Sequence, residues 1–257
     1  EKNVQQKSAK PCMEPQAEYE APPGFGDHKQ NNYSLNFNIE KVNMDKRDFT
    51  SLTPQYKFAD TLEEQKAQLK NNPLLQRMLK ARLDISTDPY RPIFHYVNPE
   101  NTLNDPNGLC YWQGRWHLFY QAYPPEDPSQ HWGHAVSKNL VHWEQLPIAI
   151  YNKKRDDAAF SGSAIIDLDN TAGWKTGKND CMVAAWTSTG RGECISYSND
   201  NGRTFQEFEG NPVIKHNGRD PKIIWYKPNQ HWVMAVFDGD NKLGYIEFYS
   251  SNNLMDW

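Results

Sequence analysis

From Tyr90 to Trp257, short apolar or aromatic runs alternate with clusters of turn-forming residues, and no stretch shows the period of a long helix. This alternation is typical of an all-β fold. Three of the turns resemble one another, because each is a polar segment that follows an apolar run and ends on an aromatic residue. They are Ser137–Trp143, Ser198–Phe205 and Ser250–Trp257, with the aromatic residues 62 and 52 positions apart. The repeat predicts a chain built from similar β-sheet units.

A second series of motifs runs out of phase with these turns. Each of its members precedes a strand-like run: Asp105-Pro106, Phe160-Ser161-Gly162-Ser163 and Asp220-Pro221, with Asp105, Ser161 and Asp220 lying 56 and 59 positions apart. Intervals of this length fit four-stranded blades of a β-propeller, with one motif at the start of the first strand of each blade. Because first strands line the central channel of a propeller, we expect these motifs to converge on its axis.

Asp105 and Asp220 occupy equivalent places in their repeats, and each directly precedes a proline. A residue before proline is driven out of the helical region, so Asp105 is held in an extended segment at the mouth of a strand. Two acids on the axis of an aromatic-lined channel suit glycoside hydrolysis, in which one carboxylate attacks or stabilises the sugar and another donates a proton. The plainer alternatives are an ordinary turn at Asp105 and a salt-bridged turn of Asp220 with Arg219.

Composition and residue spacing argue against several classes of partner and cofactor. The formal net charge is −4 and no basic face interleaves with the aromatic residues, so nucleic acid is not expected as a partner. No stretch approaches the roughly 18 apolar residues of a membrane span. The four cysteines form no CxxC pair, and His131 and His134 have metal-like spacing without a third ligand. We therefore expect no metal site and no cofactor, and Ser163 lacks the Gly-x-Ser-x-Gly context of a hydrolase triad.

The N-terminal third has a different character. Residues 1–58 are rich in Asn, Gln, Lys and Pro and predict a flexible leader. Residues 59–88 carry apolar positions at helical spacing on both sides of Asn71-Asn72-Pro73, which predicts two short helices. Residues 89–257 form the predicted partial propeller. The first residue is Glu and no targeting pattern follows, so either a targeting peptide has been removed or the sequence begins within a gene.

Five motifs follow one another between residues 104 and 221: Asn104–Gly108, Trp116–Gln121, His131–Ala135, Phe160–Ser163 and Arg219–Pro221. In this set and order they resemble the catalytic domain of glycoside hydrolase family 32, the invertase, levanase and inulinase group. The resemblance implies a five-bladed β-propeller, of which this chain holds about three blades. It does not extend to the residues before about Tyr90.

By this resemblance Asp105 is the nucleophile that attacks a terminal β-fructosyl unit of sucrose or a fructan, in a retaining hydrolysis. Asp220 holds sugar hydroxyls and stabilises the transition state, and Arg219 keeps Asp220 ionised. The pocket for the fructosyl unit is shaped by Asn104, Gln121, Trp132, Phe160 and Ser161. The simpler roles are packing for Trp132 and Phe160, and a satisfied strand end for Gln121. The family also favours a secreted or periplasmic location, while oligomeric state is not indicated.

The sequence departs from the family at the general acid/base. Members carry a Glu-Cys motif after the Arg-Asp-Pro motif, whereas Glu193-Cys194 precedes Arg219–Pro221 and is interpreted as a strand segment of the second repeat. Continuing the period beyond Asp220 places the true motif at about residues 276–279. We therefore expect this chain to lack its proton donor, to be weakly active or inactive, and to expose apolar faces and strand edges. A fragment of a longer product or one half of a split protein explains this.

Two other functions remain open at this stage. One is a non-catalytic propeller that binds carbohydrate through the same pocket. The other is a related five-bladed hydrolase of arabinan or xylan, which the Arg219–Pro221 and Phe160–Gly162 motifs disfavour. Sucrose, inulin and levan are not distinguished, because contacts with the leaving group fall on variable loops.

Overall fold

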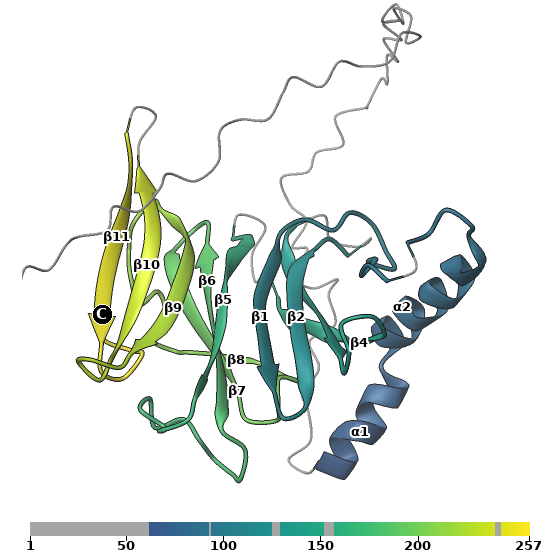
Figure 1. Cartoon of the computed structure of the whole chain (residues 1–257), viewed down its shortest axis with the longest axis horizontal. Helices are drawn as coiled ribbons and strands as arrows, with labels where there is room; N and C mark the ends of the chain where they lie inside the picture. Colours follow the sequence, from purple (N-terminus) through teal and green to yellow (C-terminus); the bar gives the residue numbers. More distant parts are fainter. Residues whose placement is uncertain (1–61, 93, 125–128, 152–156, 240–242) are drawn as a thin grey trace, which may run out of the picture. The chain divides into compact units, whose positions relative to one another are not determined.

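The alternating apolar runs form three antiparallel sheets in the computed structural model, which describes residues 62–92, 94–124, 129–151, 157–239 and 243–257 (Figure 1). All of them belong to one compact unit, residues 46–257. The leader predicted for residues 1–58 lies outside the described residues. The sheets confirm the all-β prediction and the estimate of about three propeller-type units.

Each sheet is assembled from strands in simple chain order. The first comprises β1 (Pro106–Trp112), β2 (Arg115–Ala122), β3 (His131–Ser137) and β4 (Trp143–Ile150). The second comprises β5 (Ala159–Asp167), β6 (Cys181–Ser188), β7 (Gly192–Ser198) and the short β8 (Gln206–Glu207). The third comprises β9 (Arg219–Tyr226), β10 (His231–Gly239) and β11 (Gly244–Ser251). This is the repeated meander that the two motif series predict.

The first strands of the three sheets, β1, β5 and β9, lie side by side (Figure 1). Gly108 permits the closest approach of β1 to β5, since a Cβ at this position would lie 2.9 Å from the Cβ of Ala164. Ser163 joins β5 to β9, because its hydroxyl donates to the Pro221 carbonyl at 2.9 Å and accepts the Ile223 N–H at 3.0 Å. The two acid motifs are thereby brought to neighbouring strands.

The pairing of each first strand is irregular near its start. The register shifts between Asn107 and Cys110 in β1, between Ala159 and Gly162 in β5, and opposite the start of β9 between Ala235 and Phe237. Irregularities of this kind free side chains from the regular alternation and are frequent beside functional sites. In this protein they coincide with the predicted site motifs.

The repeated polar turns are built alike. Asn139 and Asn253 each accept two backbone N–H groups, and Trp143 and Trp257 each donate the indole N–H to a carbonyl three residues earlier. The equivalent of Ser137 is Ser251, one residue later than the sequence repeat suggested, because Ser251 bonds the N–H of Asn253 as Ser137 bonds that of Asn139. In the middle turn Asp200 has the corresponding role, because its carboxylate accepts the Ser198 hydroxyl and both the N–H and the hydroxyl of Thr204.

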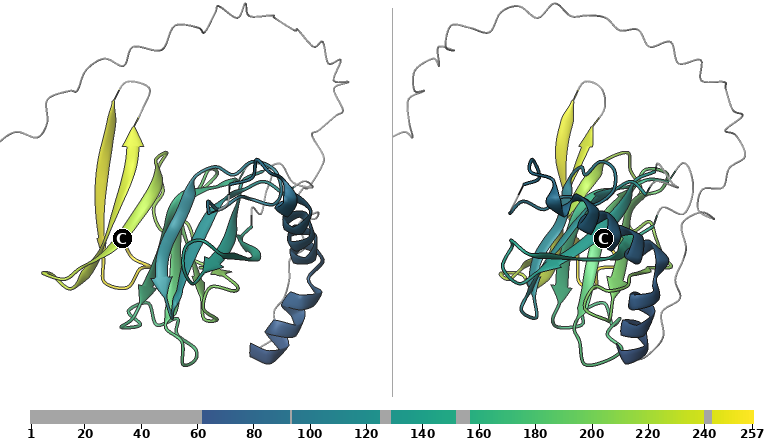
Figure 2. Two further views of the ribbon diagram at one scale, coloured as in Figure 1. Left: turned by 45° about the vertical axis from the view of Figure 1, so that its right-hand side comes forward. Right: turned by 90° about the vertical axis from the view of Figure 1, so that its right-hand side faces the viewer.

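Two helices precede the sheets, α1 (Leu62–Asn71) and α2 (Pro73–Asp84), followed by a short 3-10 turn (Ile85–Thr87). Asn72 caps α2, since its Oδ1 accepts the Leu75 N–H at 2.9 Å, and Pro73 occupies the first helical position, where no N–H is needed. Met78 of α2 packs on Ile148 of β4. Helix α2 therefore covers the outer strand of the first sheet, on the side away from the third sheet (Figure 2).

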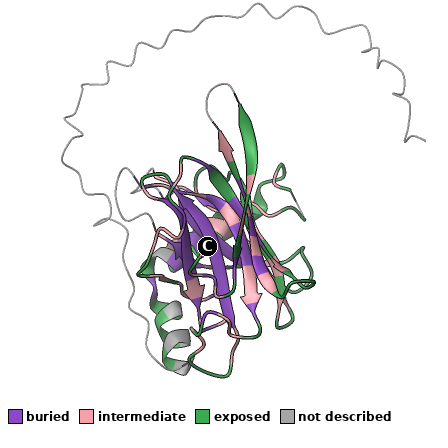
Figure 3. Ribbon diagram, turned by 90° about the vertical axis from the view of Figure 1, so that its left-hand side faces the viewer, coloured by how far each residue is buried: buried purple, intermediate pink, exposed green. Residues whose placement is uncertain are grey.

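The third sheet is buried on one face only (Figure 3). Ile223, Trp232, Met234 and Val236 lie in the core against the second sheet. The opposite face carries exposed apolar side chains on all three strands: Ile224, Tyr226, Phe237, Ile246 and Phe248. The apolar exposure expected of this chain is thus found on its C-terminal sheet.

Two further observations concern the helices and the cysteines among the described residues. No helix among them has the length and apolar character needed to cross a membrane. Cys110, Cys181 and Cys194 are free thiols, so the disulfide that the sequence left open among them is not formed.

Candidate active site

Asp105 lies directly before β1 and is held by side chains from two other strands. Ser161 of β5 donates its hydroxyl to Asp105 Oδ2 at 2.7 Å, and Gln121 of β2 donates Nε2–H to the same oxygen at 3.2 Å. The Gln121 amide nitrogen also donates to Ser161 Oγ at 2.7 Å. Charge-assisted hydrogen bonds of this kind fix a carboxylate firmly. One oxygen of Asp105 is therefore anchored, while the residue as a whole stays exposed.

A second layer of polar groups orients Gln121. Gln130 donates Nε2–H to Gln121 Oε1 at 2.9 Å, which turns the amide nitrogen of Gln121 towards the acid. The Tyr123 hydroxyl accepts from Gln130 at 2.5 Å and from Asn104 Nδ2 at 2.9 Å. Sequence analysis missed Tyr123 and Gln130, since neither lies in a motif. Their position on both sides of the β2–β3 connection is the only signal that the sequence offered.

Asp220 is the second residue of β9 and has a left-handed backbone, with φ of 65°. Its N–H donates to Thr187 Oγ1 at 3.0 Å. Partial burial raises the pKa of Asp220 above its ordinary value, the Arg219 charge lowers it, and the Asp105 charge raises it again. The last effect places the two predicted carboxylates near enough for their charges to interact.

The guanidinium of Arg219 is one of several influences on the pKa of Asp220. Its Nε lies 3.5 Å from Asp220 Oδ2, and the side chains of Arg219 and Asp220 are 57% and 50% exposed. The guanidinium also lies over the Phe237 ring, 5.6 Å from the centroid. Its charge favours ionised Asp220, but burial outweighs it and the pKa of Asp220 is raised.

The prediction that the Trp132 ring binds the sugar requires a correction. Trp132 is fully buried on β3 and donates its indole N–H to the Phe160 carbonyl at 2.8 Å. A ring with no exposed surface cannot stack on a sugar, so Trp132 packs beneath the site and supports Phe160. The half-buried Phe160 and the exposed Asn104 remain in place to line a pocket.

Three groups in the third sheet and its approach satisfy a distance criterion for metal ligands, with ligand atoms of His216, Asp238 and Glu247 all within 4.8 Å. Each is already engaged. His216 Nδ1 accepts the Gly218 N–H at 3.0 Å, Asp238 accepts the Gly239 N–H, and Glu247 accepts the Tyr249 hydroxyl. The two histidines with metal-like spacing in the sequence, His131 and His134, are fully buried. His134 Nε2 lies 3.1 Å from His117 Nδ1, within hydrogen-bond distance.

The family model of the glycosyl hydrolases family 32 N-terminal domain matches residues 95–257. A levanase of Bacillus subtilis is 45% identical over 179 residues, which cover 66% of this chain and 26% of the levanase. Invertase 1 of Saccharomyces cerevisiae is 44% identical over 183 residues, covering 65% of this chain and 34% of the invertase.

Solved structures agree with these relatives. A β-fructofuranosidase from Schwanniomyces occidentalis, complexed with fructosyl-erythritol, matches with a TM-score of 0.60 and 34% identity, over 65% of this chain and 35% of that one. An exo-inulinase from Aspergillus awamori matches with a TM-score of 0.60 and 34% identity, over 66% and 39% of the two chains. This chain therefore spans between about a quarter and two fifths of the length of these four relatives.

Proposed function

Because this chain belongs to glycosyl hydrolase family 32, we propose that it supplies the nucleophile side of a retaining β-fructosidase site. Asp105 is the proposed nucleophile, and Asp220 binds hydroxyls of the fructosyl unit. Asn104, Phe160 and Arg219 line the pocket, while Gln121 and Ser161 hold Asp105. The substrates are sucrose or fructans, in line with the levanase and the invertase among the relatives.

One observation carries the proposal. Both hydrogen bonds that Asp105 receives from Ser161 and Gln121 fall on Oδ2. Among the described residues no side chain forms a hydrogen bond with Oδ1. This oxygen is therefore available for attack while Oδ2 is held in place. A nucleophile must be both oriented and accessible, and this arrangement satisfies both requirements.

The proposed reaction has two steps. Asp105 Oδ1 bonds to the anomeric carbon as the bond to the leaving oxygen breaks, and that oxygen takes a proton from a general acid. Water then attacks the same carbon, the ester to Asp105 breaks, and the proton of the water passes to the same acid/base group. The Asp220 carboxylate accepts hydrogen bonds from sugar hydroxyls, and its negative charge stabilises the positive charge that develops on the ring.

The proton donor is proposed to come from outside residues 1–257. Glu193, the glutamate of the Glu-Cys pair in this chain, lies on β7 with no exposed surface. A carboxyl group in this position cannot reach a leaving oxygen. Its place on a strand of the second sheet agrees with the interpretation from the sequence.

The test uses the full-length gene product that contains this chain, with sucrose, inulin and levan as substrates. We expect release of fructose, and a loss of at least about 10³-fold in kcat for Asp105→Asn, because the nucleophile is removed. Rapid denaturation during turnover, followed by peptide mass analysis, should find one anhydrohexose unit on the peptide that carries Asp105. Asp169→Asn, at an exposed acid in the β5–β6 turn, is the control.

Three results would contradict the proposal. Release of arabinose rather than fructose would favour an arabinan hydrolase. Sugar binding without any release would favour a non-catalytic propeller. Labelling of a peptide without Asp105 would assign the nucleophile elsewhere.

A further inference from the structure

Glu193 is a fully buried carboxyl group that the proposed reaction does not use. It lies on β7, directly opposite Thr187 of β6 in the strand pairing. Its own N–H and carbonyl bond the segment that leads to β9, through Ile214 at 2.9 Å and Val213 at 2.8 Å. The residue therefore connects two strands of the second sheet with the approach to the third.

The hydrogen-bond directions around Glu193 are determined by its neighbours. The Asp220 N–H can only donate, so Thr187 Oγ1 accepts it, at 3.0 Å. The single hydroxyl hydrogen of Thr187 must then go to the Glu193 carboxylate, whose oxygens lie at 2.9 and 3.1 Å. His216 Nδ1 accepts the Gly218 N–H, so neutral His216 carries its hydrogen on Nε2 and donates it to Glu193 Oε1 at 2.9 Å. Glu193 thus serves as the acceptor for both neighbours.

Asp220 needs such support because of its backbone. A φ of 65° is unfavourable for a residue with a Cβ, by about 1 kcal/mol, and persists only where surrounding contacts impose it. The bond from its N–H to Thr187 holds one side of the residue, and the bond from Ser163 to the carbonyl of Pro221 holds the other. Thr187 in turn is oriented by Glu193.

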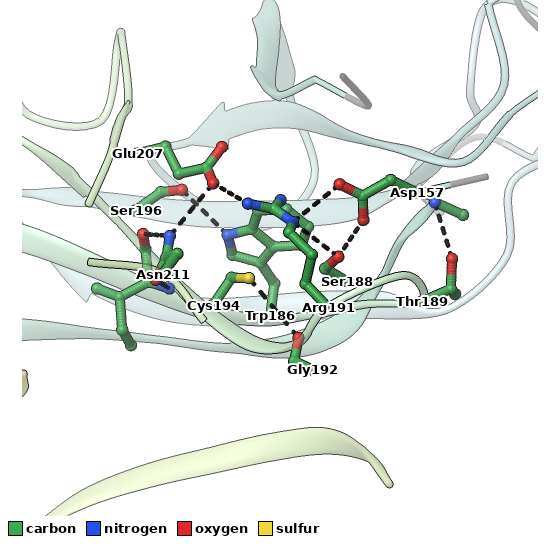
Figure 4. A network of polar contacts seen from close by, with 12 residues as sticks. Asp157, Trp186, Ser188, Thr189, Arg191, Gly192, Cys194, Ser196, Glu207 and Asn211 are labelled. Carbon is green, nitrogen blue, oxygen red and sulfur yellow. Dashed lines mark hydrogen bonds and ion pairs between the residues drawn. The ribbon is translucent and has the colours of Figure 1, made fainter. Parts of the chain in front are cut away.

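The hairpin that carries Thr187 and Glu193 is itself rigidly held (Figure 4). Arg191, in the β6–β7 turn, bonds Asp157 at 2.9 Å, Ser188 at 3.0 Å and also Glu207. Gly192 is required beside it, because its φ is 115° and a Cβ would lie 2.3 Å from the Ile214 carbonyl oxygen. These contacts hold the β6–β7 turn, which lies between Thr187 and Glu193.

We propose that Glu193 is a positioning residue of the active site, which holds Asp220 in place through the Thr187 hydroxyl. This inference rests on the proposed function, in which Asp220 binds the fructosyl unit. Ionised Glu193 accepts both the Thr187 and the His216 hydrogens. Protonated Glu193 is a donor at one oxygen, so the two hydrogens share the single remaining acceptor oxygen and the hold on Asp220 weakens.

Burial brings the pKa of Glu193 into the pH range in which activity can be measured. Burial raises the pKa of Glu193 to about 7, the Thr187 hydrogen bond lowers it, and the Asp220 charge raises it. The titratable groups that face it are His216 before β9, Asp220 on β9 and Tyr249 on β11. Asp238 of β10 lies behind His216, at 3.9 Å from its Nδ1. We therefore expect kcat to fall as the pH drops below about 7.

The experiment compares Glu193→Ala and Glu193→Gln with the wild type in the full-length gene product. Glu193→Ala should lower kcat about 10- to 100-fold with little change in KM, because a small displacement of Asp220 costs transition-state binding. Glu193→Gln offers one acceptor oxygen and one donor, as protonated Glu193 does, so its kcat should match the low-pH value of the wild type and show no ionisation near pH 7. The melting temperature is recorded for each variant, and Asn211→Ala, which alters the same sheet without touching Thr187, is the matched control.

The outcomes separate this inference from the proposed function. If the wild type releases fructose and depends on Asp105, but both Glu193 variants keep kcat and the pH profile of the wild type, the positioning role is wrong. The role is also wrong if a fructoside with an activated leaving group restores the activity of Glu193→Gln, since that result would make Glu193 the proton donor. If the wild type releases no fructose, the proposed function itself fails.

Discussion

At the scale of single residues, Ser161 and Ser163 of β5 lie two positions apart but have different roles. Ser161 donates to the Asp105 carboxylate, whereas Ser163 bonds backbone groups of β9 at Pro221 and Ile223. The first contact orients a reacting group and the second joins two sheets. The sequence motif Phe160–Ser163 shows both serines without separating their roles.

Substitution of these serines should separate catalysis from stability. Ser161→Ala removes a hydrogen bond to a charged group, so we expect kcat/KM to fall about 10- to 100-fold with little change in melting temperature. Ser163→Ala leaves buried backbone groups without a partner and should lower the free energy of unfolding by about 1–3 kcal/mol. Steady-state kinetics and urea unfolding of both variants measure this. Equal effects of the two variants on kcat/KM would contradict the assignment.

At the scale of elements, β2 and β3 are joined by a buried histidine pair. His117 Nδ1 lies 3.1 Å from His134 Nε2, and both rings are nearly or fully buried. Burial, then the charges of Arg115 and Arg203, lower the pKa of His117 to about 4, and burial lowers that of His134. One ring must donate and the other accept, so protonation of both would break the bond.

This pair should make the fold sensitive to acid. Above pH 6.5 the histidines are neutral in both states, and between about 6.5 and 4 the unfolded chain takes up protons that folded His117 refuses. The free energy of unfolding should then fall by about 3 kcal/mol from His117 alone as the pH drops through this range. Urea unfolding at several pH values measures it, in a Glu193→Gln background because Glu193 titrates in the opposite direction. His117→Gln should reduce the slope, and an unchanged slope would contradict the assignment.

At the scale of the whole molecule, the third sheet leaves one apolar face uncovered. Ile246 and Phe248 of β11 are 56% and 72% exposed, and the strand pairing sets them beside Phe237 and Ala235 of β10. A contiguous apolar face on an edge strand favours association with other chains. The isolated 257-residue chain should therefore self-associate at micromolar concentration.

The double variant Ile246→Ser with Phe248→Ser should reduce this association. The expected result is weaker light scattering and weaker binding of an apolar dye, because the variant removes the two most exposed large apolar side chains of β11. Leu168→Ser, at an exposed position in the β5–β6 turn, is the control and should change neither signal. Equal scattering from all three proteins would show that this face does not drive association.

The sequence by itself determined the all-β class, the repeat and the two carboxylates. Period-2 alternation, turn chemistry at Asn139, Asp200 and Asn253, and proline after Asp105 and Asp220 are local properties that a linear sequence displays. Such signals survive folding, because each turn is satisfied by hydrogen bonds among residues fewer than eight positions apart.

Only the tertiary structure decided which side chains face the site and which lie beneath it. Trp132 belongs to a site motif but is fully buried. Glu193 lies on a strand, as predicted, and its carboxylate is linked to the Asp220 backbone through a single hydroxyl group. The physical reason is that burial and long-range hydrogen bonds depend on the packing of strands that are 27 to 60 residues apart in the chain, as in the contact of Glu193 with Asp220 through Thr187 and in the bond of Ser163 to Ile223.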